Sequence, residues 1–222
     1  MNRLKQLFLL LSIFFSLQAQ AQFSLGIEGG YIRSWEDYGE TIIPENAVIH
    51  VNRLNLSLSA YYGLGKNFKI GIEPGYIQRG AACVPGWRGR PSFFGDTKFL
   101  LNYVALPIMV AKDFFVYKNK ISLSVKLGYG VSYLVSGIQE NVFIGSDDPP
   151  VRRDLDISGP DSSFNRWDHG WYGGLSIIYH LQNNQLFLST DYYNAINDTD
   201  RFNSSQNRSL SFNLGYAIPL GE

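Results

Sequence analysis

The residues best suited to chemistry are a carboxylate and a histidine side by side, Asp168 and His169, preceded by Ser162 and Ser163. A carboxylate that orients a histidine beside a serine is the arrangement used for nucleophilic acyl hydrolysis. Loops rich in serine and aspartate are common, however, and a histidine at a loop end is ordinarily solvated. We therefore expect no catalytic residue and no enzyme activity. An acyl hydrolase that uses His169 is kept as an alternative.

No pattern indicates a metal or a cofactor, and none is expected. The single cysteine, Cys83, allows neither an intramolecular disulfide nor a cysteine-based metal site. The acidic stretches at 146–150, 154–161 and 197–200 lack the spacing of a dedicated calcium loop. Arg88 and Arg90 follow Trp87, and two guanidinium groups beside an aromatic ring suit the phosphates of lipopolysaccharide.

The elements that must position these residues are β-strands. Residues 121–134 read ISLSVKLGYGVSYL, with an apolar or aromatic side chain at every odd position. Such period-two alternation indicates a strand with two different faces. It recurs, with varying clarity, at 23–33, 51–63, 67–79, 99–112, 169–181, 185–195 and 208–220, although 99–112 is apolar on both faces. Alternation alone leaves open whether the apolar face lines the interior of a soluble barrel or faces lipid.

The connections between these segments favour lipid. Long connections at 34–50, 80–98, 135–168 and 196–207 alternate with short ones at 64–66, 113–120 and 182–184. Long outer loops and short periplasmic turns are typical of an outer-membrane barrel. We predict an all-β fold: an eight-stranded antiparallel transmembrane β-barrel, an up-and-down meander with a polar, filled lumen. Pro74 and Pro107 fall inside predicted strands, where each removes a hydrogen-bond donor.

The first 21 residues have the features of a secretory signal peptide. A basic start, an apolar core from Leu7 to Leu17 and an Ala-Gln-Ala site ending at Ala21 predict cleavage there, which leaves 22–222 as the barrel. No later segment is apolar for long enough to form a membrane helix, which excludes a helical inner-membrane protein. The chain has 19 basic and 19 acidic residues, so no basic surface indicates nucleic acid.

Aromatic residues gather at both ends of the predicted strands, as in the two interfacial girdles of a membrane barrel. The predicted girdle residues are Phe23, Tyr31, Tyr62, Phe68, Tyr76, Tyr133, Trp171, Tyr179, Tyr192 and Tyr216. With the apolar face in lipid, the opposite face brings seven charged side chains into the lumen. These are Glu28, Arg53, Lys69, Glu73, Arg79, Lys126 and Asp191. Because a buried charge requires a partner, we predict a network of ion pairs among them.

Several runs carry a family resemblance: GIEPGYIQRG at 71–80, LNYVALPIMVAK at 101–112 and KLGYGVSYL at 126–134. Together with DHGWYGGLSIIY at 168–179 and SLSFNLGYAIPL at 209–220, they resemble the PorT-like outer-membrane β-barrel family of Gram-negative bacteria. The resemblance implies an eight-stranded barrel in the outer membrane and implies no particular activity. The namesake of that family takes part in protein secretion and gliding.

The sequence thus predicts a monomer in the cell outer membrane with a structural or interaction role carried by its long outer loops. Its expected partners are outer-membrane lipid and lipopolysaccharide, and envelope or secretion proteins. One alternative is a component of a secretion or envelope-assembly machine that makes contacts through the loops or the periplasmic turn 113–120. The other is the hydrolase built on His169, with lipid A as substrate. A soluble lipocalin-like carrier is the remaining structural alternative.

Overall fold

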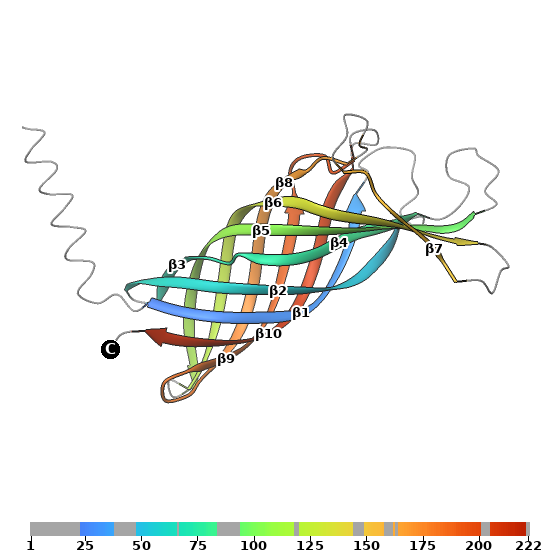
Figure 1. Cartoon of the computed structure of the whole chain (residues 1–222). Coiled ribbons are helices and arrows are strands. Elements are labelled where there is room, and N and C mark those ends of the chain that lie inside the picture. Colours follow the sequence, from blue (N-terminus) through green and yellow to red (C-terminus); the bar gives the residue numbers. More distant parts are fainter. Residues whose placement is uncertain are drawn as a thin grey trace, which may run out of the picture.

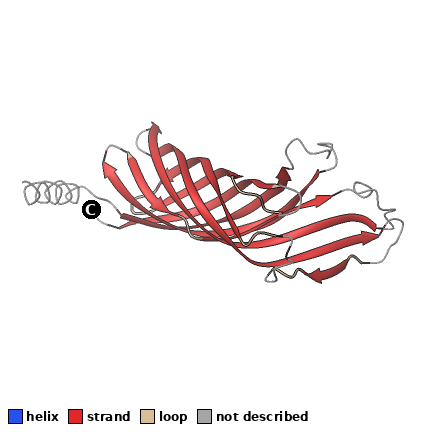
Figure 2. Cartoon of the chain, turned by 90° about the horizontal axis from the view of Figure 1, so that it is seen from above, coloured by secondary structure: helices blue, strands red, loops and turns tan. Residues whose placement is uncertain are grey.

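The computed structural model describes residues 23–37, 48–65, 67–83, 94–117, 120–143, 149–157, 162, 164–200 and 205–220. Antiparallel strands make up nearly all of these ranges and wrap around a common axis (Figures 1 and 2). Within the same ranges, no helix has the length and apolar character needed to cross a membrane.

The strands follow one another around a closed ring. They are β1 (Phe23–Asp37), β2 (Val48–Gly65), β3 (Phe68–Ile72), β4 (Gly75–Cys83), β5 (Phe94–Tyr117), β6 (Ile121–Phe143), β7 (Val151–Asp154), β8 (Trp167–His180), β9 (Gln185–Ala195) and β10 (Gln206–Leu220). β1 pairs with β10 and so closes the ring. β3 and β4 together form one interrupted wall strand, and β7 lies outside the ring. The eight-stranded up-and-down barrel expected from the sequence is therefore confirmed.

Burial alternates along each wall strand and tells which face is inside. In β6, Lys126 is 5% exposed whereas its neighbour Leu127 is 62% exposed. The exposed face of the ring is apolar and the buried face is rich in serine, asparagine and charged groups. A water-soluble barrel would bury the apolar face instead, so this arrangement identifies the outer surface as the one that meets lipid.

The two prolines that interrupt the alternation lie at one shared break in the sheet. The amide of Glu73 donates to the carbonyl of Pro107 at 3.1 Å, and the amide of Leu58 donates to the carbonyl of Pro74 at 2.9 Å. Pairing between β5 and the interrupted strand formed by β3 and β4 stops after Ile72 at the end of β3 and starts again at Gly75 in β4. The donor that Pro107 lacks therefore faces the gap between β3 and β4, and the two prolines cause a single interruption.

The predicted loop boundaries are wrong at the outer end of the barrel. β5 and β6 continue well beyond the expected strands 99–112 and 121–134, and β7 falls within the expected loop 135–168. β5 also runs to Tyr117, through most of the expected turn 113–120. The outer halves of β4, β5 and β6, with β7, form a sheet that projects past the ring (Figures 1 and 2). We call this sheet the extracellular extension.

A small apolar core lies where the extension leaves the ring. Leu101, Tyr103, Leu134 and Phe164 are buried together, and Leu155 packs against them. The amide of Leu155 also donates to the carbonyl of Gly137 at 2.9 Å. Part of the long connection before β8 is thereby folded onto the outer end of the barrel.

Candidate functional site

The middle of the lumen holds one lysine among three carboxylates. Lys126 on β6 lies 3.1 Å from Glu73, 3.0 Å from Asp191 and 4.0 Å from Glu28, measured from the ammonium nitrogen to the nearest carboxylate oxygen. All four side chains are largely buried. They come from β1, the break between β3 and β4, β6 and β9, so this cluster links opposite walls of the barrel.

Neutral donors add hydrogen bonds to two carboxylates of this cluster. The hydroxyl of Tyr61 donates to Glu73 at 2.5 Å, and those of Ser57 and Ser189 donate to Glu28 at 3.0 and 3.2 Å. A buried carboxylate is strongly disfavoured unless such bonds replace its lost water. The serines on the inward face therefore have a specific role in holding the charge of the cluster.

A second layer fills the lumen nearer the outer end and is centred on Arg79, which is 1% exposed. Its guanidinium lies 3.1 Å from Asp168 and donates to the hydroxyl of Tyr172 at 2.8 Å. The guanidinium carbon also lies 3.7 Å from the ring centre of Tyr193, a cation–π contact. Asp168 accepts further bonds from Tyr193 at 2.7 Å and from Asn207 at 2.9 Å. Side chains thus block the lumen at this level, as the width of an eight-stranded barrel allows.

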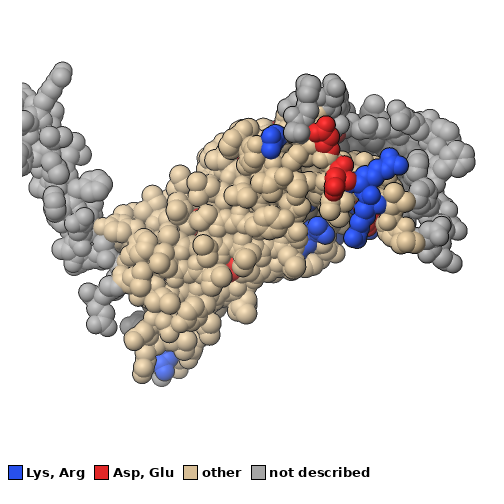
Figure 3. Space-filling model, in the orientation of Figure 1, with Lys and Arg blue, Asp and Glu red and all other residues tan. Residues whose placement is uncertain are grey.

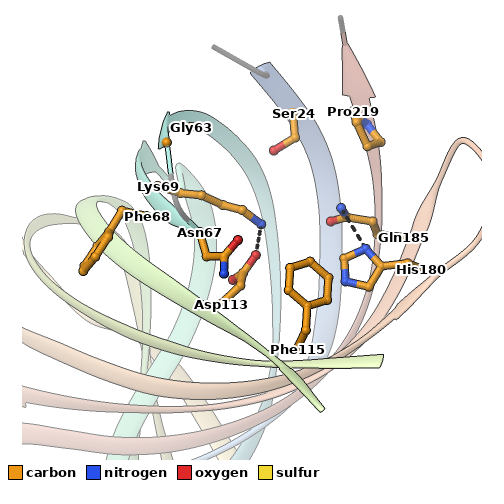
Figure 4. Close-up of a pocket in the computed structure, with 11 residues that line it drawn as sticks. Ser24, Gly63, Asn67, Phe68, Lys69, Asp113, Phe115, His180, Gln185 and Pro219 are labelled. Carbon is orange, nitrogen blue, oxygen red and sulfur yellow. Dashed lines mark hydrogen bonds and ion pairs between the residues drawn. The ribbon is translucent and has the colours of Figure 1, made fainter. Parts of the chain in front are cut away.

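The periplasmic end of the lumen is more open. A pocket of about 330 Å³ lies there and is lined by polar and aromatic side chains (Figure 4). Lys69 and Asp113 point toward each other across it and form an ion pair. His180 shares a hydrogen bond with the buried hydroxyl of Ser122 at 2.7 Å, and its ring lies 5.4 Å from that of Phe115. Ser24, Lys69 and Gln185 line both this pocket and a smaller cavity of about 60 Å³ beside Lys126.

The structure divides six of the seven predicted lumen charges among three levels. Four of them form the Lys126 cluster, Arg79 belongs to the outer layer, and Lys69 lies at the periplasmic mouth. Arg53 faces inward and is half-buried, and within the described ranges it has no ion pair. The partners of Arg79 and Lys69 are Asp168 and Asp113, which sequence reasoning did not assign to the lumen. Asp168 occupies the opposite face of the strand from the exposed Trp167 and Trp171. This alternation is the sequence signal that could have placed Asp168 in the lumen.

The geometry opposes the hydrolase alternative. Asp168 and His169 are neighbours in β8, so they point to opposite faces: Asp168 is buried in the lumen, and His169 faces outward. His169 bonds instead to the hydroxyl of Tyr129 at 2.6 Å through its Nδ1. The hydroxyl of Ser162 donates to the carbonyl of Phe164 at 3.2 Å. Ser163 lies outside the described residues. The carboxylate therefore cannot orient this histidine.

All ten predicted girdle residues lie on the outward face of the barrel. Seven are clearly exposed, among them Phe68 at the periplasmic end and Trp171 at the outer end. Tyr62, Tyr133 and Tyr216 are half-buried by their neighbours. On the face seen in Figure 3, charged side chains gather mainly toward the extracellular extension and the middle of the barrel is almost entirely uncharged. Arg88 and Arg90 lie outside the described residues.

A closed antiparallel ring with an apolar outer band and a charged lumen is the architecture of an outer-membrane β-barrel protein, and its place is the cell outer membrane. A family model described as "outer membrane protein beta-barrel domain" matches residues 15–201, and the chain belongs to that family. A search of curated proteins returns no match.

Several solved outer-membrane proteins are similar to this chain. Neisserial surface protein A has a TM-score of 0.46 and 14% identity, with 90% of this chain and 99% of that chain covered. OprG from Pseudomonas aeruginosa has a TM-score of 0.45 and 11% identity, with 90% and 96% covered. Ail, the attachment invasion locus protein of Yersinia pestis, solved with the heparin analogue sucrose octasulfate, has a TM-score of 0.39 and 13% identity, with 89% and 99% covered.

Proposed function

We propose that this protein is a closed barrel that acts at the cell surface, where its extracellular extension contacts other molecules without transport or catalysis. The observation that carries the proposal is the layer around Arg79, which fills the lumen below the extension. A protein whose lumen is filled has its accessible surface at its two ends. The outer end is the larger of these, because β5 and β6 continue well past the ring.

The alternative role, as a component of a secretion or envelope-assembly machine, allows contacts through the outer loops or through the periplasmic turn. We also propose that this protein is related to the PorT-like branch of these barrels. The resemblance rests on the sequence runs at 71–80, 101–112 and 126–134. A protein contact at the periplasmic turn belongs to the alternative role alone, so a position at that end of the barrel distinguishes the two roles.

Site-specific photo-crosslinking on intact cells tests this difference. A photoreactive amino acid replaces Arg153, exposed on β7, or Lys120, exposed beside the periplasmic turn. We expect a discrete adduct from position 153 and none from position 120. An adduct from position 120 alone would favour the envelope-machine role and contradict the proposal. Leu175, on the lipid-facing surface of β8, serves as the matched position that should yield no protein adduct.

Reconstitution provides a second readout. The purified barrel in a planar lipid bilayer is expected to show no stable channel conductance. Steady single-channel openings of the folded protein would mean that the Arg79 layer leaves a path for ions, and the proposal would then lose its main support.

A further inference from the structure

Two arginines lie on the lipid-facing side of β1 and β10 just beyond the apolar band, beside polar residues of β2. The last apolar row on these strands consists of Tyr31, its cross-strand neighbour Phe212 on β10, and Leu54 on β2, which are 43%, 54% and 66% exposed. Arg33 is the next outward-facing residue of β1, about 7 Å further along the strand. Its neighbours across the strands are Leu210 and Asn52.

The following row adds a second cation and two rings. Trp35 lies opposite Arg208 on β10, and its ring lies 5.2 Å from that of His50 on β2 in an edge-to-face arrangement. Arg208 is about a third exposed and forms an ion pair with Asp37 at 2.5 Å. We call Arg33, Trp35, His50, Asn52 and Arg208 the outer cation patch.

Among the described residues, the patch has an unbalanced positive charge. The pair between Arg208 and Asp37 is neutral overall, whereas Arg33 is exposed and has no ion pair within the described ranges. The nearest carboxylate along β1, Glu36, faces the lumen and is 2% exposed, so it does not offset the charge on the lipid side.

We propose that the outer cation patch binds a phosphate group of lipid A in the outer leaflet of the membrane. This inference is independent of the role proposed for the extracellular extension. Its position is the first argument: the patch faces lipid and begins where the apolar band ends, which is the level of the lipid headgroups.

Chemistry is the second argument. A guanidinium group presents a planar fork of donors that matches phosphate oxygens, and such charge-assisted pairs are stronger than neutral hydrogen bonds. The amide of Asn52 and the indole of Trp35 add neutral donors around Arg33. An amphipathic ring at this level is favourable in the headgroup region as well.

The opposite interface provides a built-in comparison. Lys112 faces outward at the periplasmic end of β5, and its ammonium lies 4.6 Å from the ring centre of Phe68 and 5.2 Å from that of Phe114. That cation is held by two aromatic faces, unlike Arg33. It also lies at the wrong interface for lipid A, so Lys112→Gln is a matched control that removes one outward-facing cation.

The test is native mass spectrometry of the folded, detergent-solubilised barrel, titrated with lipid A that carries both phosphates. Parallel titrations use dephosphorylated lipid A, phosphatidylglycerol and inorganic phosphate. We expect Arg33→Gln to weaken binding of the phosphorylated lipid A on the order of tenfold, the loss of one charge-assisted contact. Lys112→Gln should bind as the wild type does. Each variant is first checked for heat-modifiable gel mobility, which reports a folded barrel.

Three outcomes would overturn the proposal. They are equal binding of dephosphorylated lipid A, wild-type affinity in Arg33→Gln, and equal or tighter binding of phosphatidylglycerol or inorganic phosphate. A gain-of-function variant keeps the test valid should Arg33→Gln fold poorly. Asn52→Arg places a second unpaired cation beside Arg33 on the same exposed face, and it should tighten binding of phosphorylated lipid A. No tightening in the folded Asn52→Arg protein would also contradict the site.

Discussion

Replacing Arg79 with methionine removes the cation from the outer lumen layer and leaves Asp168 buried without its charge partner. Breaking a buried ion pair by removing one member costs about 3–5 kcal/mol. Asp168 keeps its bonds from Tyr193 at 2.7 Å and Asn207 at 2.9 Å, which favours the lower end of that range. Loss of the cation–π contact with Tyr193, at 3.7 Å, adds about 1 kcal/mol. We expect Arg79→Met to lower the free energy of unfolding by about 4 kcal/mol.

The assay is reversible urea unfolding in lipid vesicles, followed by tryptophan fluorescence and by gel mobility of unboiled samples. Arg53→Met is the matched control, because Arg53 also faces the lumen but is half-buried and has no ion pair within the described ranges. Its expected cost is below about 1 kcal/mol. If the two single variants unfold at the same urea concentration, burial and pairing do not govern these arginines and the reasoning is refuted.

A double variant separates the ion pair from mere packing. Adding Asp168→Asn to Arg79→Met removes the unpaired charge. Tyr193 and Asn207 donate to different oxygens of Asp168, so the single amide oxygen introduced by the second substitution keeps one of these two bonds. The double variant should therefore be more stable than Arg79→Met, by roughly 1.5 kcal/mol or more, a coupling typical of groups in one network. If the double variant is less stable than Arg79→Met, the stability lost in Arg79→Met comes from the missing packing of the arginine side chain and not from the broken ion pair.

Three further predictions use other parts of the barrel. Lys126→Gln leaves three buried carboxylates without a cation, so its urea midpoint should rise as pH falls and these groups take up protons; a midpoint independent of pH would contradict this. A Cβ at Gly130 would lie 2.7 Å from the backbone of Pro107, whereas one at Gly173 would meet nothing within 4 Å. Gly130→Ala should therefore cost about 1–3 kcal/mol by urea unfolding and Gly173→Ala under about 1 kcal/mol, and equal costs would disprove the packing argument. Leu188→Arg, in the middle of the apolar band, should lower the free energy of unfolding in vesicles by about 2–4 kcal/mol, against about 0–1 kcal/mol for Leu54→Arg near the outer interface. The reverse order would show that the apolar band has been assigned to the wrong height on the barrel.

Period-two alternation predicted the strands, and the alternation of long and short connections predicted which face of the barrel meets lipid. Along 121–133 each residue keeps the face that its position in the pattern predicts. The pattern fails at the next residues for a physical reason. Asn102 pairs with Ser136 and Tyr103 with Leu134, so Val135 has no opposite residue. Such a bulge shifts the alternation by one position, and the continuation of β6 into the extracellular extension is hidden from a simple periodic reading.

The pairing of charges across the lumen could not be predicted from the sequence in the same way. Which inward residues meet depends on their height along tilted strands, and a sequence does not give that height. Lys69 and Glu73 are close together in the sequence, yet Lys69 pairs with Asp113 whereas Glu73 pairs with Lys126. The sequence suggests Asp168 only as a helper of His169. Its role is visible once the barrel places it beside Arg79.

The length of β6 also affects which molecules can reach the outer end of this protein. From Tyr133 at the outer girdle the strand continues to Phe143, about 33 Å along its own direction and about 25 Å above the membrane once strand tilt is included. That height is comparable to the thickness of the hydrocarbon layer itself. In an outer leaflet made of glycolipid, the tip of the barrel would therefore stand among the sugar chains. Cells that make long chains would hide the tip from large molecules, and cells that make short chains would expose it.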